Sequence, residues 1–109
     1  MQITDLPLGV TNWAEVPGEE RVGTTGTALW LTWQFGPVRV RMVKYSPGYV
    51  ADHWYQKGHF LLVVAGELGT ERADGRQFVP RPGMGYQVAD GAEAHRGHTA
   101  AGATLFIID

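Results

Sequence analysis

The sequence contains no cysteine, which excludes disulfide bonds and thiolate metal ligands. Long hydrophobic runs are also missing: the longest, from Phe60 to Ala65, is far shorter than the roughly 20 residues that cross a bilayer. The first residues, Met1 to Asp5, lack the basic region and the apolar stretch of a secretory signal. We therefore expect a cytoplasmic protein that has no membrane partner.

Positive charge is scarce as well. Nine Lys and Arg residues stand against eleven Asp and Glu residues, for a net charge of −2. The basic residues are scattered, and the densest group is Arg39, Arg41 and Lys44. Binding to a phosphate backbone needs a concentrated basic surface, so we expect no nucleic-acid partner.

Glycine and proline, in contrast, are plentiful. The chain has 109 residues, 15 of them glycine and six proline, with 44% hydrophobic and 18% charged residues. Its length allows one domain with one core. Many turn-forming residues and no helical period favour short strands, so the sequence predicts an all-β fold.

Strand patterns are clear from residue 27 onward. The run TALWLTWQF at residues 27–35 is rich in β-branched and aromatic residues. In the next strand, PVRVRMVKY, Arg39 and Arg41 alternate with apolar residues, so one row faces inward and the other faces solvent. Further strands are predicted at residues 49–56, 59–68, 76–80, 84–88 and 103–108. One more strand is predicted to carry His95.

Seven to nine short strands with frequent turns predict a sandwich or barrel. We assign residues 27–109 to this barrel. Residues 1–26 are interpreted as an irregular segment that packs on the barrel or on a dimer partner. We expect a homodimer, because a partner can cover the open edge of a sheet.

Residues 48–66 carry a recognisable motif. Gly48, His53 and Gly66 resemble the first motif of the cupin family, which has Gly, then His-x-His, then Glu, then Gly. Tyr55 stands in the place of the second histidine, and His59 in the place of the glutamate. The resemblance implies a single cupin-type barrel, a double-stranded β-helix or jelly roll.

The later segment PGMGYQVADGAEAH resembles the second cupin motif, whose closing histidine corresponds to His95. Asp90 and Ala92 replace the usual proline and glycine. The segment from Asp52 to Trp54 also resembles a group of small bacterial cupin-fold proteins named for an Asp-His-Cys-Trp motif. In this chain Tyr55 replaces the cysteine of that motif.

By this resemblance, His53, His59 and His95 hold a divalent transition metal, which could be Zn, Fe, Ni or Cu. Positions 53, 55 and 59 also share parity, so strands interrupted at residues 57–58 would aim all three side chains inward. The alternative is three hydrogen-bonded histidines in a metal-free polar cavity. Tyr55 is the predicted catalytic residue, as a neutral phenol that donates a hydrogen bond, because a phenol pKa near 10 makes phenolate costly.

Five residues are predicted to wall the barrel, as core filling or as a substrate pocket: Leu61, Val63, Tyr86, Trp33 and Phe106. The resemblance suggests a metal-dependent enzyme of the dioxygenase or isomerase type that acts on a small polar or anionic metabolite. A second hypothesis is a non-catalytic module that binds or senses a small ligand or a metal. A third is a structural dimer in which the histidines only satisfy each other.

Overall fold

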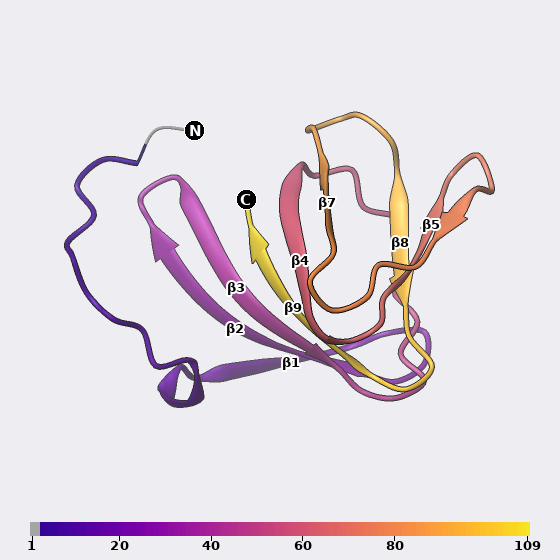
Figure 1. Ribbon diagram of the computed structural model, residues 1–109, viewed down its shortest axis with the longest axis horizontal. Coiled ribbons are helices and arrows are strands. Elements are labelled where there is room, and N and C mark those ends of the chain that lie inside the picture. The colour runs from indigo at the N-terminus through magenta and orange to yellow at the C-terminus, as the bar shows by residue number, and fades with distance from the viewer. Residues whose placement is uncertain (1–2) are drawn as a thin grey trace.

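The computed structural model describes residues 3–109 and contains, within that range, nine strands and one short 3-10 helix (Figure 1). The elements are η1 (Trp13–Glu15), β1 (Gly18–Val22), β2 (Thr27–Phe35), β3 (Val38–Tyr45), β4 (His59–Gly66), β5 (Gly69–Arg72), β6 (Gln77–Phe78), β7 (Gly85–Val88), β8 (His95–His98) and β9 (Ala103–Ile108). The predicted all-β class is confirmed. In this part of the chain, no helix is long and apolar enough to cross a membrane.

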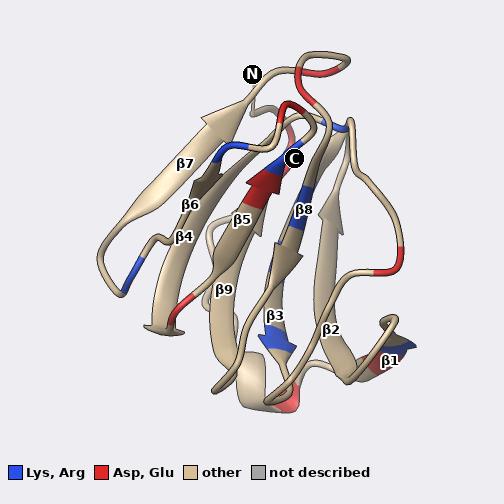
Figure 2. Ribbon diagram, turned by 90° about the vertical axis from the view of Figure 1, so that its right-hand side faces the viewer, with Lys and Arg blue, Asp and Glu red and all other residues tan. Residues whose placement is uncertain are grey.

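The strands form two antiparallel sheets. The larger has the order β1-β2-β3-β9-β4-β7, and the smaller has the order β6-β5-β8. Figure 2 shows the smaller sheet in front of the larger one, so that the two enclose an interior. This two-sheet arrangement agrees with the predicted jelly-roll barrel.

The core lies on the inner face of the larger sheet. In β9 the side chains of Leu105 and Ile107 are buried, and in β4 those of Leu61 and Val63. Val63 lies opposite Leu105 and Leu61 opposite Ile107, and residues directly opposite each other share a face of the sheet. Leu61 and Val63 therefore lie inside the barrel, as predicted.

Strand β3 turns its basic row inward. Arg41 is 6% exposed and Val43 is 1% exposed, and the two share a face because alternate residues of a strand do so. Val43 lies opposite the core residue Leu105, which identifies that face as the inner one. Val40 and Met42 therefore point outward, so the barrel interior receives arginine side chains.

The outer face of the same sheet is apolar. Phe60, Leu62 and Trp33 are 59%, 43% and 44% exposed. Phe106 lies opposite Leu62 and packs edge to face on Trp13 of η1, with ring centroids 6.3 Å apart. The prediction that Trp33 and Phe106 wall the interior is therefore wrong, because both have the parity of the outer row.

The strand predicted at residues 49–56 is not formed. Only isolated bridges occur in this segment: Val50 pairs with Thr25 and with His98, and Tyr55 pairs with His95. Between them Asp52 and His53 are exposed, so this stretch has no continuous buried face that would hold a strand in register. The segment is a loop that is attached to β8 at two points.

The described part of the N-terminal segment, residues 3–26, contains a strand and a short helix that the sequence analysis did not predict. Strand β1 pairs with β2 along its whole length, from the Gly18–Leu31 pair to the Val22–Thr27 pair. Helix η1 begins after Asn12, whose side chain accepts a hydrogen bond from the Ala14 amide. This segment thus adds an edge strand to the larger sheet.

The closing glycine of the first motif has a steric role. Gly66 ends β4 with φ at 71°, a conformation that residues with a Cβ rarely adopt. A Cβ at this position would lie 2.1 Å from the carbonyl oxygen of Gly102. Only glycine therefore lets β4 turn so close to the start of β9.

Truncation of Leu105 tests the position of the core. Leu105 is fully buried, so we expect Leu105→Ala to lower the free energy of unfolding by about 2 to 5 kcal/mol. Urea denaturation followed by tryptophan fluorescence measures the change. Val22, which is 71% exposed on edge strand β1, is the control, and Val22→Ala should change stability by less than about 0.5 kcal/mol. Equal losses in the two variants would contradict this core.

Candidate functional site

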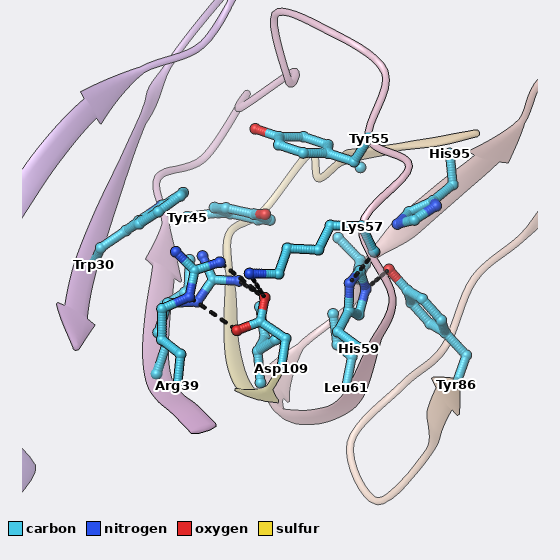
Figure 3. A pocket seen from close by; sticks show the side chains of 15 residues that line it. Trp30, Arg39, Tyr45, Tyr55, Lys57, His59, Leu61, Tyr86, His95 and Asp109 are labelled. Carbon is cyan, nitrogen blue, oxygen red and sulfur yellow. Dashed lines mark hydrogen bonds and ion pairs between the residues drawn. The ribbon is translucent and has the colours of Figure 1, made fainter. Parts of the chain in front are cut away.

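A cavity of about 100 Å³ lies inside the barrel, between the two sheets (Figure 3). Its wall includes four charged side chains, two imidazoles, three phenols and Trp30. Figure 3 shows Arg39 and Asp109 on one side and His59, Tyr86 and His95 on the other. The cavity therefore has a charged end and an imidazole end.

The charged end is organised by Asp109, which follows β9. Its side chain is 1% exposed and receives two hydrogen bonds from Arg39, at 2.9 and 2.8 Å. Arg41 donates a third at 3.2 Å, and the ammonium of Lys57 lies 3.9 Å from the same carboxylate. Burial alone would raise the pKa of Asp109, but the Arg39 hydrogen bond and the three positive charges together lower it, so it is ionised.

Arg41 is held between a carboxylate and an aromatic ring. Its guanidinium lies 4.4 Å from the centroid of the Trp30 ring, and Arg21 also lies over that ring, at 4.3 Å. Burial, together with the charge of Arg39, lowers the pKa of Arg41. An arginine stays protonated at any physiological pH, so Arg41 remains a cation. Its buried Nε–H has no hydrogen-bond partner among residues 3–109.

At the imidazole end, two hydrogen bonds define the tautomer of His59. Its Nδ1 lies 3.1 Å from the Lys57 carbonyl oxygen, which can only accept, so Nδ1 carries the proton. Its Nε2 lies 3.3 Å from the Tyr86 hydroxyl, which must therefore donate. Burial, and next the neighbouring His95, lowers the pKa of His59 to about 4. His59 is therefore neutral at physiological pH.

His95 begins β8 and points at His59, with ring centroids 5.0 Å apart. Its Nδ1 lies 3.0 Å from the carbonyl oxygen of Glu93, so the neutral ring carries its proton there. The Nε2 atom of His95 is then a hydrogen-bond acceptor. It is buried and has no partner in the described part of the chain.

His53 does not join the other two histidines. Its side chain is 60% exposed, lies outside the cavity wall and pairs with Asp52 at 2.6 Å. Within residues 3–109, no three His, Cys, Asp or Glu side chains are arranged to hold a metal ion. The expected three-histidine set is thus not assembled, because residues 52–54 form an exposed loop rather than an inward-facing strand.

Tyr55 does line the cavity. Its backbone exchanges two hydrogen bonds with that of His95, at 2.8 and 3.0 Å. Its ring also contacts His53, with centroids 4.2 Å apart. Burial, and next the carboxylate of Asp52, raises the pKa of Tyr55, so the phenol is neutral. In Figure 3 the hydroxyl of Tyr55 points away from His59 and His95.

None of the four charged residues of the cavity wall was predicted as a site residue: Arg39, Arg41, Lys57 and Asp109. The alternation in PVRVRMVKY was the only signal for the two arginines, and it left open which row faces inward. Asp109 had no signal, because its partner Arg39 lies 70 residues away. Tyr86 was predicted as a wall residue, and its place beside His59 confirms that position.

A second, larger pocket of about 390 Å³ adjoins the cavity and shares Tyr86 and His95 with it. Its wall also includes Phe78 and an ion pair between Arg72 and Glu93. The rings of Tyr86 and His95, with centroids 6.0 Å apart, therefore stand between the inner cavity and this outer pocket.

No protein-family model matches the sequence. No curated protein matches it either. Similar proteins are found among solved structures.

Three of the similar structures align with more than nine tenths of the chain. A predicted oxalate decarboxylase from Thermotoga maritima has a TM-score of 0.77 and 13% identity, over 92% of this chain and 96% of that one. Ectoine synthase from P. lautus has a TM-score of 0.74 and 15% identity, over 93% and 76% of the two chains. A sugar phosphate isomerase of the cupin superfamily from Silicibacter pomeroyi has a TM-score of 0.71 and 16% identity, over 92% and 74%.

At these identities the likeness shows the fold and not the activity. It agrees with the two antiparallel sheets of this chain. The chain is thus a small protein of the cupin fold.

Proposed function

We propose that this cupin-fold protein binds a small carboxylate metabolite inside its barrel. The observation that carries the proposal is the charge of the cavity wall: Arg39, Arg41 and Lys57 face a single carboxylate, that of Asp109. The cationic side chains of the wall therefore outnumber its carboxylate side chains, and one of the cations, Arg41, is buried. An anion that replaces water there gains strong, charge-assisted hydrogen bonds.

The free Nε–H of Arg41 supports the same conclusion. A buried donor that has lost water and found no acceptor costs about 1 to 3 kcal/mol, and more when it is charged. A ligand carboxylate would supply that acceptor. The names of two fold neighbours refer to oxalate and to a sugar phosphate, which are also small anions.

The chemistry available beside the carboxylate is proton transfer and hydrogen bonding. His59 offers a neutral Nε2 paired with the Tyr86 hydroxyl, and burial raises the pKa of Tyr86 so that it stays a donor. An isomerase-type reaction needs groups of this kind. The catalytic role of Tyr55 remains a prediction, with its neutral phenol as a hydrogen-bond donor in the cavity wall.

A second candidate function is retention of a divalent metal ion. It is favoured by the backbone carbonyls that hold Nδ1 of both His59 and His95, since metal-binding imidazoles are usually oriented in this way. Two imidazoles are fewer than the three expected ligands, and His53 is absent from the pair. The nearby cations also repel a divalent ion.

We propose that the protein forms a homodimer through the apolar outer face of the larger sheet. The exposed side chains of Phe60, Leu62, Val64 and Trp33 support this proposal, because exposed apolar patches on a soluble protein often cover an interface.

Removal of one cation tests the proposed carboxylate site. Arg41→Met deletes the unpaired donor and one charge, so we expect its affinity for the acid that binds best to fall about tenfold to a hundredfold. Isothermal titration calorimetry with a panel of short carboxylic acids measures this change. Arg81→Met, which alters an exposed arginine, is the matched control and should bind as the wild type does.

Metal content separates the two candidate functions. Elemental mass spectrometry of protein purified without a histidine tag is expected to find much less than one equivalent of any transition metal, because the two imidazoles share the cavity with three cations. One equivalent that is lost in His95→Ala and kept in His53→Ala would instead support the metal site. One equivalent that is lost in both variants would restore the three-histidine assignment.

Acid should destabilise the fold through His59. The ordinary histidine pKa of 6.5 applies to the unfolded chain, and the folded value is about 4, so the unfolded chain binds the proton more readily. Stability is therefore full above about pH 6.5 and falls as the pH approaches 4. In EDTA buffer, the loss of unfolding free energy between pH 8 and pH 4.5 should be smaller in His59→Gln. The wild type and the variant share the other titratable and charged groups that face residue 59, which are Lys57, Asp109, Arg41, Tyr86 and His95. An equal loss of unfolding free energy in the two proteins would therefore show that protonation of His59 is not the cause.

A further inference from the structure

Two residues of the cavity wall each have a buried polar atom without a hydrogen-bond partner among residues 3–109. One of these atoms is a hydrogen-bond donor and the other is an acceptor. Nε of Arg41 is a cationic donor. Nε2 of His95 is an acceptor, because its other ring nitrogen donates to the Glu93 carbonyl. Both residues are 6% exposed. A ligand that satisfies both atoms needs an anionic acceptor and a separate hydrogen-bond donor.

The charges of the cavity wall and the cavity volume indicate which chemical group of the ligand donates this hydrogen bond. An ammonium group would be repelled by Arg39, Arg41 and Lys57, which outnumber the carboxylate side chains of the wall. A neutral hydroxyl carries no such penalty, and it donates well to an imidazole nitrogen. The volume of about 100 Å³ limits the ligand to a few non-hydrogen atoms.

We propose that the ligand is a short-chain hydroxy acid. Its carboxylate binds at Arg41, and its hydroxyl donates to Nε2 of His95. This inference rests on the proposed carboxylate site and adds a specificity-determining residue to it. His95 distinguishes a hydroxy acid from its deoxy analogue, because only the hydroxy acid satisfies the buried acceptor.

The experiment compares matched pairs of acids. Glycolate and acetate, and lactate and propionate, are titrated by calorimetry into the full chain in the presence of EDTA. We expect each hydroxy acid to bind about tenfold or more tightly than its partner, as one additional hydrogen bond to a buried group predicts. In His95→Phe this preference should disappear, so that the affinity ratio within each pair falls to about one. His53→Phe, which alters the exposed histidine, is the matched control and should keep the preference.

The outcomes separate the two claims. If none of the acids binds, the carboxylate site itself is overturned. If all four bind but the members of each pair bind equally, the carboxylate site stands and the hydroxy-acid inference fails, with water satisfying His95. A preference that appears only when a transition metal replaces EDTA also overturns the inference, because the hydroxyl partner would then be the metal.

A spectroscopic readout in the unaltered protein covers the case in which His95→Phe does not fold. In a ¹⁵N-histidine spectrum, lactate should shift the Nε2 resonance of His95 in the direction of a hydrogen-bonded acceptor, and propionate should leave it in place. Equal shifts with both acids would overturn the role assigned to His95.

Discussion

The buried carboxylate of Asp109 is the interaction on which the barrel interior depends. Strand β3 turns Arg39 and Arg41 toward the core, and a charge removed from water costs several kcal/mol unless it is paired. Asp109 binds both guanidinium groups and lies near Lys57. This pairing lets charged side chains share an interior with the buried apolar residues of β4 and β9. Because one side-chain carboxylate serves three cations, the side chains of the cavity wall carry an excess of positive charge.

At the opposite end of the cavity, the backbone sets the tautomer of two imidazoles. Carbonyl oxygens of Lys57 and Glu93 hold the Nδ1 protons of His59 and His95, so both Nε2 atoms are acceptors. The cavity therefore offers cationic donors at one end and a neutral acceptor at the other. The fold neighbours share the barrel at 13–16% identity. The chemistry of this chain thus lies in a few inward side chains rather than in the fold.

The strands that could be predicted are those with the strongest local patterns. Residues 27–35 and 103–108 form strands with the expected bounds, because continuous β-branched and aromatic runs favour extended backbone. The segment at residues 49–56 did not form one, since its polar residues bury no face. Trp33 and Phe106 were placed on the wrong side of the sheet. A large aromatic side chain suits the core and an exposed interface equally well, so residue type alone could not place them.

The sequence by itself determined the all-β class and the glycine at residue 66, which follow from local patterns and from backbone conformation. The resemblance to the cupin motifs indicated Tyr55, His59 and His95 for the interior, and all three line the cavity. Only the tertiary structure decided that the arginine row of β3 faces inward, that His53 stays in an exposed loop and that Asp109 closes the charged end. A period of two separates the faces of a strand without saying which is buried, and Arg39 meets Asp109 across 70 residues of chain.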